Sequence, residues 1–371
     1  MKKIKLGDYI ELLTDYHSGG SYETMKNNTK ILHTPDYGVY VRTLNFEKND
    51  FKNDLIYCDK KSYDFLEYSH LKENDVLMNK IANPGSVYIM PKVDYPATCA
   101  MNLFLLRFKN INQRYMYYVM KNSEDYIKKQ AHGTTTKTIT KEEVRNLEFN
   151  IHNTKEEQDR VEKLLTDIDK KIENNNAINN NLQQVATTLY DFLFAKKQPN
   201  GKLSDILLEN EKSTIQVGSS DSVCGNYPFF TSGETINEWQ DYFVDGINCY
   251  LSTGGNASIK VYAGKAAYST DTWCIYGKEN YSPYLYFYLK SIIKSINSSY
   301  FAGSGLKHLQ KEALLDIDLY IPTIDEIKTF NKIVNPILIQ TSQLFIESKK
   351  LIKQRDFLLP LLMNGQATID E

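Results

Sequence analysis

The sequence predicts an α+β protein made of two repeats, each a globular domain of short strands and helices followed by one long helix. Short motifs of the first half return in the same order in the second half, and two T-x-x-E motifs each precede a long heptad pattern. At 371 residues and a hydrophobic fraction of 42%, the chain is long and apolar enough to bury more than one core.

The repeat is visible as matching motifs in matching order. Residues 5–8 (KLGD) return as residues 202–205 (KLSD), and residues 115–117 (YMY) return as residues 284–286 (YLY). The motif G-x-x-x-K-x-[IL]-x-K-E begins at Gly133 and again at Gly303, 170 residues later. Because the order holds while the separation drifts, we interpret the chain as a duplicated domain with loop insertions.

The globular domains are predicted at residues 1–153 and 198–322. Each contains short apolar runs separated by turns, and each has an aromatic segment typical of a helix, at 115–121 and 284–296. Pro199 and Gly201 mark the break between the first long helix and the second domain. The runs expected to form strands include 39–41, 76–78, 87–90, 103–108, 227–230 and 259–263.

Two long helices are predicted at residues 154–197 and 323–371. Thr154 with Glu157, and Thr323 with Glu326, form capping boxes, which satisfy free N–H groups at a helix start. Behind each cap, apolar residues alternate in steps of four and three, which indicates two helices that pair as an antiparallel coiled coil. The residues expected in the seam are Val161, Leu165, Ile168, Ile172, Leu182, Leu189, Phe330, Val334, Ile337, Leu344, Leu351 and Leu358.

Asn175 and Asn179 fall in the same seam, where asparagine lowers stability but fixes the register or the orientation of a helix pair. The alternative is that this asparagine-rich stretch is frayed. A helix over residues 155–197 would be roughly 60–65 Å long at about 1.5 Å per residue. We therefore expect the helix pair to be a rod that sets the separation of two similar domains.

The charge of the chain argues against a strongly basic binder. The formal net charge is −2, from 44 basic and 46 acidic side chains. Residues 1–153 carry 22 basic and 19 acidic side chains, a net charge of +3, whereas residues 198–322 carry 9 and 13, a net charge of −4. Because non-specific affinity for DNA comes from cations that replace counterions, the second domain would need a partner to help hold phosphates.

The motifs of several enzyme classes are weak or missing in the sequence. Residues 301–305 (FAGSG) resemble the glycine-rich loop of an S-adenosylmethionine methyltransferase, but a helix pattern precedes them instead of a strand, so we interpret them as a turn. Residues 83–85 (NPG) lack the aromatic residue of an adenine-binding N-P-P-aromatic loop, and there is no Walker lysine loop. The five cysteines and six histidines show no metal-ligand spacing, so we expect reduced thiols and no metal site.

Polar turns recur at matched places in both globular domains, and they supply the candidate binding residues. Their Asn, Arg, Lys, Ser and Thr side chains can hydrogen-bond base edges and phosphates, although polar turns are also ordinary loop structure. We expect Lys137 and Lys307 to hold phosphate and Arg42 to contact a guanine, because residues 198–322 contain no arginine. The candidates for DNA binding are Arg42, Thr43, Asn45, Lys80, Asn83, Thr134, Thr135, Thr136 and Lys137 in the first domain, and Thr231, Ser232, Ser252, Thr253, Asn256, Ser304, Lys307 and His308 in the second.

This organisation resembles the specificity subunit of type I restriction–modification systems. The resemblance rests on two variable globular repeats that each precede a capped long helix, on the KL[GS]D openings, and on the G-x-x-x-K-x-[IL]-x-K-E turns. It also rests on an Ile-Pro-like lead into each helix, Ile321-Pro322 in the second repeat and Ile151-His152 in the first, where histidine replaces proline. The resemblance covers nearly the whole chain and implies two target-recognition domains, each of which reads one half of an interrupted DNA site.

The resemblance also implies a chain that is not itself catalytic and carries no cofactor of its own. It implies a complex on double-stranded DNA with two methyltransferase subunits that use S-adenosylmethionine, and with restriction subunits that use ATP and Mg²⁺. We expect a cytoplasmic protein with no membrane segment, because the sequence has no 18-residue apolar run and no secretory apolar region near Met1. Two alternatives stay open: a duplicated scaffold that binds only proteins, and a DNA enzyme whose catalytic site is not evident.

Overall fold

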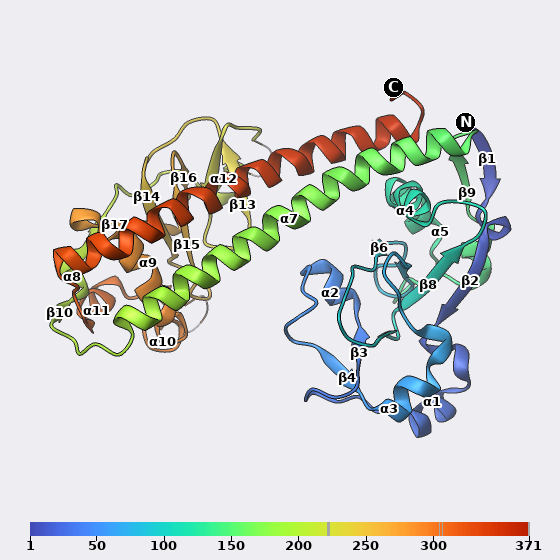
Figure 1. Cartoon of the computed structure of the whole chain (residues 1–371), viewed down its shortest axis with the longest axis horizontal. Coiled ribbons are helices and arrows are strands. Elements are labelled where there is room, and N and C mark those ends of the chain that lie inside the picture. The colour runs from blue at the N-terminus through green and yellow to red at the C-terminus, as the bar shows by residue number, and fades with distance from the viewer. Residues whose placement is uncertain (221–222, 304, 306, 370–371) are drawn as a thin grey trace. The chain divides into compact units, whose positions relative to one another are not determined.

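The computed structural model describes residues 1–220, 223–303, 305 and 307–369 (Figure 1). The chain forms two compact units: Met1–Lys170 together with Leu351–Glu371, and Lys171–Lys350. Each unit therefore contains a globular domain and a part of both long helices. The predicted globular segments, residues 1–153 and 198–322, lie one in each unit, whereas each predicted long helix, 154–197 and 323–371, is divided between the two units.

The first unit is built on short, mostly antiparallel strands. A four-stranded sheet has the order β2 (Ile10–Asp15), β8 (Leu103–Phe108), β5 (Val76–Asn79) and β6 (Val87–Ile89). A second sheet has the order β4 (Ile56–Cys58), β3 (Gly38–Val41) and β7 (Ala97–Cys99), and β1 (Lys2–Lys5) pairs with β9 (Glu148–Ile151). Its helices are α1 (Tyr22–Asn28), α2 (Thr43–Glu47), α3 (Lys60–Phe65), α4 (Gln113–Asn122), α5 (Glu124–Gln130) and α6 (Lys141–Asn146).

The second unit repeats the strand order of each of these three sheets. Its four-stranded sheet has the order β11 (Leu207–Glu209), β17 (Thr272–Gly277), β14 (Ile247–Ser252) and β15 (Ile259–Ala263). β13 (Ile236–Trp239), β12 (Tyr227–Phe230) and β16 (Ala267–Tyr268) form the second sheet, and β10 (Gly201–Lys202) pairs with β20 (Asp318–Leu319). The remaining elements are α8 (Leu203–Ile206), α9 (Ser282–Ser291), α10 (Ile293–Ser299), α11 (Lys311–Leu315) and the pair β18 (Phe301–Ala302) and β19 (His308–Leu309).

The matching strand orders confirm the duplicated α+β fold. In both units a parallel pair, β3 with β7 and β12 with β16, joins otherwise antiparallel strands. The aromatic segments form helices as predicted, although residues 284–296 are divided between α9 and α10.

The long helices are α7 (Lys155–Phe194) and α12 (Ile324–Met363). Both predicted capping boxes are present: the Thr154 N–H donates to Glu157 at 3.1 Å, and the Thr323 N–H donates to Glu326 at 2.8 Å. In each box the glutamate N–H donates back to the threonine hydroxyl at 3.3 Å. His152, which stands where the second repeat has proline, uses the N–H that proline lacks to donate to the Tyr115 hydroxyl at 3.0 Å.

Within each unit the two helices run antiparallel. In the first unit, Arg355 of α12 donates to Asp169 of α7 at 3.0 Å, and Arg160 near the start of α7 lies 3.5 Å from the carbonyl of Ile369. In the second unit, Asn175 donates to Glu347 at 2.9 Å, and the rings of Phe194 and Phe330 lie 5.3 Å apart. All twelve predicted seam residues are buried or half-buried, and Asn175 is only 1% exposed.

The helices complete the core of each unit. In the first unit, Val161 and Leu165 of α7 and Leu362 of α12 pack with Tyr115 and Met116 of α4. In the second unit, a larger aromatic core joins α7 and α12 to α9, including Tyr190, Phe194, Tyr284, Phe287 and Phe330. Within the described ranges, none of the helices combines the length and the hydropathy that crossing a lipid bilayer requires.

Candidate nucleic-acid interface

Two of the polar loops predicted to bind DNA meet in the first unit. Ile81 forms a β-bridge with Thr138, the Ala82 N–H donates to the carbonyl of Lys137 at 3.1 Å, and the Ile139 N–H donates to the carbonyl of Lys80 at 3.1 Å. Main-chain hydrogen bonds therefore hold the loop after β5 against the loop before α6. We call this arrangement, residues 79–83 with residues 132–139, the first loop junction.

The second unit contains the same junction at equivalent positions. Gly254 forms a bridge with His308, the Gly255 N–H donates to the carbonyl of Lys307 at 3.0 Å, and the Leu309 N–H donates to the carbonyl of Thr253 at 3.0 Å. Position for position, residues 80–82 correspond to 253–255 and residues 137–139 to 307–309. We call residues 252–256 with residues 302, 303, 305 and 307–309 the second loop junction.

The junction backbone needs a left-handed residue at one place in each repeat. Ala82 has φ +68° and Gly255 has φ +79°, so the equivalent residue has the same unusual conformation in both units. Glycine adopts this region readily, whereas a residue with a Cβ is disfavoured there. The shared left-handed conformation is independent support for the equivalence of the two loops.

Several predicted binding residues of the first domain are exposed at the junction. Asn83 and the run Thr134, Thr135, Thr136 and Lys137 are all exposed to solvent. Lys137 contributes its carbonyl to the junction while its side chain remains exposed, and Lys307 does the same in the second unit. An exposed lysine at the same backbone position in both repeats suits a contact to phosphate, which every DNA sequence offers.

Two other predicted residues of the first domain have internal partners. Lys80 is 7% exposed and forms a buried ion pair with Asp15, which also pairs with Lys141 at 2.9 Å. Asn45 is 4% exposed; it accepts from the Arg42 N–H at 2.9 Å and donates to the Asp50 carbonyl at 3.0 Å. These contacts assign Lys80 and Asn45 to holding the loops in place.

The Asp15 carboxyl is the electrostatic centre of this network. Burial would raise the pKa of Asp15, but hydrogen bonds from Lys80, Lys141 and Ser18 outweigh burial and leave its pKa below the usual value. Ser18 donates to it at 2.8 Å. The charged carboxylate is therefore the form that the fold stabilises.

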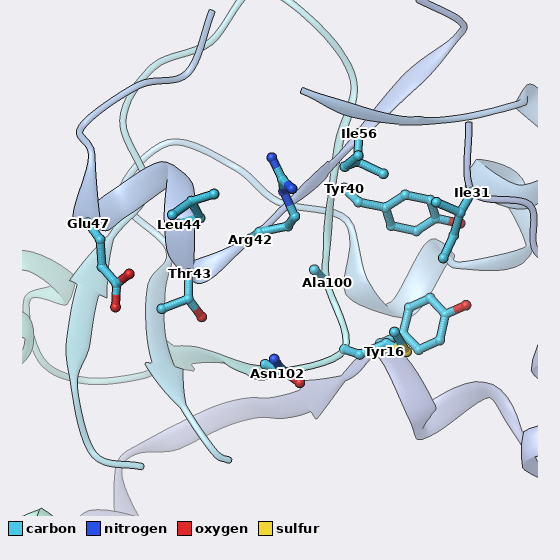
Figure 2. Close-up of a pocket in the computed structure, with 11 residues that line it drawn as sticks. Tyr16, Ile31, Tyr40, Arg42, Thr43, Leu44, Glu47, Ile56, Ala100 and Asn102 are labelled. Atoms are coloured by element: carbon cyan, nitrogen blue, oxygen red, sulfur yellow. The ribbon is translucent and has the colours of Figure 1, made fainter. Parts of the chain in front are cut away.

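Arg42 and Thr43 line a pocket of about 440 Å³ in the first unit (Figure 2). Figure 2 shows Arg42, Thr43, Glu47 and Asn102 toward one side of this pocket, and Tyr16, Tyr40, Ile31 and Ile56 toward the other. The Arg42 guanidinium donates to the carbonyl of Asp54 and lies 3.8 Å from its carboxylate, while its buried Nε has no hydrogen-bond partner among the described residues. Because Asp54 is 73% exposed, this ion pair is weak and leaves the arginine available to a ligand.

In the second unit most of the predicted hydroxyl groups are used internally. Thr231 donates to Thr235 at 2.7 Å, Ser252 donates to Asn256 at 2.8 Å, and Thr253 donates to the carbonyl of Asp271 at 2.8 Å. Ser232 also donates to the carbonyl of Asp271. The side chains of Asn256, Lys307 and His308 are exposed, and Ser304 lies outside the described residues.

Each repeated motif contains a second lysine that was not among the predicted binding residues. Lys141 pairs with Asp15 at the end of β2, and Lys311, at the equivalent position, pairs with Glu209 at the end of β11 at 3.3 Å. Each lysine thereby ties the start of a short helix to the end of a strand. The signal was present in the sequence, because both lysines stand four residues after the exposed lysine of the motif.

The second unit also has a pocket of about 560 Å³ beside Lys311 and Trp273. The Trp273 Nε1–H donates to Glu209 at 2.6 Å, and the Lys311 ammonium lies 4.5 Å from the centre of the Trp273 ring. The hydrogen bond from Trp273, followed by the contact with Lys311, lowers the pKa of Glu209. No set of three or more His, Cys, Asp or Glu side chains that could hold a metal ion occurs in the described part of the chain.

The family comparison agrees with the duplicated architecture. The family model described as "Type I restriction modification DNA specificity domain" matches residues 1–184 and again residues 198–354. The chain belongs to this family. Both copies of the domain therefore include a loop junction and the beginning of a long helix.

Two individual proteins illustrate the similarity. The specificity subunit of the type I restriction enzyme EcoDI from Escherichia coli is 28% identical over 148 residues, which make up 39% of this chain and 33% of that protein. The aligned segment thus spans one third of the length of that curated relative. The crystal structure of the S subunit of a type I restriction–modification system from M. genitalium covers 100% of this chain and 96% of its own, with a TM-score of 0.63 and 16% identity, which supports the shared fold.

Proposed function

We propose that this chain is the DNA specificity subunit of a type I restriction–modification complex, and that each unit reads one half of an interrupted DNA target. The observation that carries the proposal is the loop junction, which is built from the same main-chain hydrogen bonds in both units and presents an exposed lysine at the same position in each. Two copies of one binding frame in a chain of two specificity domains suit two half-sites.

In this proposal the chain supplies recognition and other subunits supply chemistry. Two methyltransferase subunits would carry S-adenosylmethionine and methylate adenine, and restriction subunits would use ATP and Mg²⁺. The second globular domain has a net charge of −4, so these partners would also provide part of the grip on DNA phosphates.

An exposed apolar stripe on α7 supports docking of a partner helix in the second unit. Ile178, Val185 and Phe192 follow one another at intervals of seven residues, and they are 41%, 55% and 84% exposed. Heptad spacing places them on one face of the helix, where they would pack against the apolar face of another helix. We propose that a methyltransferase subunit contributes that helix.

We further propose that the α7–α12 pair sets the length of the DNA spacer between the half-sites. Each helix has 40 residues, which corresponds to about 60 Å at about 1.5 Å per residue. Asn175 and Glu347 would fix the register, because their hydrogen bond joins the two helices at a position where Asn175 is buried.

The direct test is to map methylated adenine in cells that express the chain with its methyltransferase partner. The expected result is one bipartite, interrupted motif, and no methylation when either protein is expressed alone. Methylation by this chain alone would show a catalytic site of its own. If the partner binds but no sequence motif is methylated, the chain is a protein scaffold and the proposal is wrong.

The spacer proposal has a separate test that keeps the heptad frame. Seven residues are inserted between Asn175 and Asn176 in α7, and seven between Ile346 and Glu347 in α12, which adds about 10 Å or roughly three base-pair rises. The methylated motif should keep both half-sites and gain about three base pairs of spacer. An active variant with an unchanged spacer would contradict the spacer role.

A further inference from the structure

We propose that one equivalent turn in each unit carries a base-reading residue: Asn102 between β7 and β8, and Asp271 between β16 and β17. Neither residue was among the candidates that the sequence motifs suggested. The inference rests on the proposed role in DNA recognition and goes further, because it assigns specificity to one position of the repeat and predicts the chemistry of the base that each residue contacts.

The two turns are the same structure in the two repeats. In the first unit the Leu103 N–H donates to the carbonyl of Ala100 at 3.3 Å, and in the second unit the Thr272 N–H donates to the carbonyl of Ser269 at 3.1 Å. Each turn enters the strand at the centre of a four-stranded sheet, β8 or β17. Asn102 and Asp271 are therefore at the same turn position, immediately before that strand.

Each turn is attached to the loop junction of its own unit. The Lys80 N–H donates to the carbonyl of Asn102 at 2.9 Å, and the Thr253 N–H, at the equivalent position, donates to the carbonyl of Asp271 at 3.0 Å. In the second unit the hydroxyls of Thr253 and Ser232 also donate to that carbonyl. The backbone of the turn is thus fixed against the exposed loops that carry Lys137 and Lys307.

The side chains of these two residues are free although their backbones are fixed. Asn102 and Asp271 are both exposed, and neither side chain has a hydrogen-bond or ion-pair partner among the residues that the structure describes. This contrasts with Ser232, Ser252 and Thr253, whose hydroxyls are used by the protein. A fixed backbone with a free polar side chain loses little freedom when it binds a base edge.

The chemistry of the two side chains predicts different bases. The Asn102 amide both donates and accepts, which matches the N6 amino group and N7 of adenine. The Asp271 carboxylate only accepts, so it matches a base whose exposed edge offers an amino group: cytosine N4 or adenine N6. Because phosphates repel a carboxylate, Asp271 is unfavourable at a DNA surface unless it accepts a hydrogen bond from such an amino group.

In the first unit, Asn102 shares a pocket with a second polar residue that could contact a base. It lines the same pocket as Arg42 and Thr43 (Figure 2). Arginine pairs best with guanine O6 and N7. The first unit therefore offers an adenine-type contact and a guanine-type contact in one pocket, whereas residues 198–322 contain no arginine to do the same.

The first experiment is Asp271→Asn in the assembled methyltransferase, with methylation measured on every single-base variant of the target. The expected result is a change of about 5- to 150-fold in base preference at one position of one half-site, while the other half-site stays unchanged. A cytosine at that position should lose preference, and an adenine should gain it, because asparagine also donates to adenine N7. Asp318→Asn is the matched control, because it makes the same chemical change at an exposed residue on β20 and should leave every position unchanged.

The second experiment uses a base analogue against the first unit. Each adenine of the half-site that Asp271→Asn leaves unchanged is replaced in turn by 7-deazaadenine, which lacks the N7 acceptor. Wild-type protein should bind one of these substituted duplexes several-fold more weakly than the natural duplex. The Asn102→Ala variant should bind that substituted duplex and the natural duplex with equal affinity. A penalty of the same size in Asn102→Ala would overturn the assignment of Asn102.

The outcomes separate this inference from the proposed function. If wild-type protein directs methylation of a bipartite motif but Asp271→Asn changes no position, or changes both half-sites, the turn assignment fails and the specificity role stands. If wild-type protein directs no motif, both fail together. Denaturant unfolding of each variant should match wild type, because both side chains are exposed and have no partner in the described structure.

Discussion

The two loop junctions have the same main-chain hydrogen bonds but are supported by different side-chain contacts. In the first unit the residue that links the junction to its turn is Lys80, which is buried in an ion pair with Asp15. In the second unit the equivalent residue is Thr253, whose hydroxyl donates to the Asp271 carbonyl. The comparison shows that main-chain hydrogen bonds define the junction in both units, and that a charged or a neutral side-chain network can support it.

The largest expected effect is the exchange of a whole recognition domain. Replacement of residues 198–322 by the corresponding segment of another family member should replace one half of the methylated motif and leave the other half unchanged. The donor needs aromatic residues in place of Tyr284 and Phe287. The centre of the Tyr284 ring lies 5.2 Å from that of Phe194, and the centre of the Phe287 ring lies 6.1 Å from that of Phe330, and both partners belong to the helices that remain. Methylome mapping decides the result, and a change in both half-sites would show that the units do not read DNA independently.

The second prediction compares the networks behind the junctions. Lys80→Met leaves Asp15 with only part of its ion pairing and should lower the free energy of unfolding by about 3 kcal/mol. Thr253→Val, at the equivalent position, removes one hydroxyl hydrogen bond and should lower it by about 1 kcal/mol. Urea unfolding measures both, and equal losses would contradict the different character of the two networks.

The same ion pair predicts a dependence of stability on pH. Because the pKa of Asp15 in the folded chain lies below its ordinary value of 3.8, its contribution is complete above that value and is lost as the pH falls through the folded pKa. Wild-type protein should therefore lose more stability between pH 5 and pH 3 than Asp15→Asn, which has no carboxylate to protonate. Parallel urea titrations across that range test this, and identical slopes would argue against it.

The next prediction concerns Arg42, the only arginine proposed to read a base. Arg42→Ala should weaken discrimination at one guanine position of the first half-site by about 1–3 kcal/mol. Asp54→Ala is the control, because it removes the exposed partner of Arg42 and should change affinity by less than about 1 kcal/mol. If the Arg42→Ala variant kept both its affinity and its base preference, Arg42 would not contact a base and other side chains would read the first half-site.

A smaller and uniform effect is expected for the exposed lysines. Lys137→Ala and Lys307→Ala should each weaken binding to all DNA sequences alike and reduce the salt-dependence slope by about 0.9, the value for one lost phosphate contact. The measurement is binding of the assembled complex across a salt series. A change in base preference in either variant would mean that the lysine contacts a base.

The smallest effect comes from the junction backbone. A Cβ at Gly255 would meet no other atom within 4 Å, so Gly255→Ala introduces only the conformational strain of φ +79°. It should lower the free energy of unfolding by about 1 kcal/mol. Ala82→Gly in the first unit is the reverse change and should shift stability by no more than that amount; a large loss in either variant would contradict a purely backbone effect.

Much of the fold could be predicted because the signals were local or repeated. The capping boxes at Thr154 and Thr323 and the heptad frame depend on residues close in sequence, and the structure has both helices with their caps. β14 and β17 were not singled out. In INCYLS the apolar residues are interrupted by Asn248, and the apolar run of TWCIYG is short and does not alternate. Both are central strands buried on both faces, so packing from other elements decides their structure.

The positions of the loops in the candidate interface could be predicted from the sequence, but the contacts of their side chains could not. The motifs that match between the two repeats identified the segments that form the two loop junctions. A lysine in a polar turn gives no sign that it is buried, and Lys80 is buried because of Asp15, 65 residues away. Asn102 and Asp271 belong to no motif, but each directly precedes an equivalent strand, and aligning the two repeats by strand order reveals them.

The main-chain character of the loop junctions has a consequence for how new specificities arise. Among the described residues, no hydrogen bond of either junction uses the side chain of residue 102 or 271, so substitution at these positions leaves the hydrogen bonds in place. Mutation can therefore explore different base contacts without a loss of folding that would remove the variant from selection. A population of such chains can drift from one DNA target to another through folded intermediates, one substitution at a time.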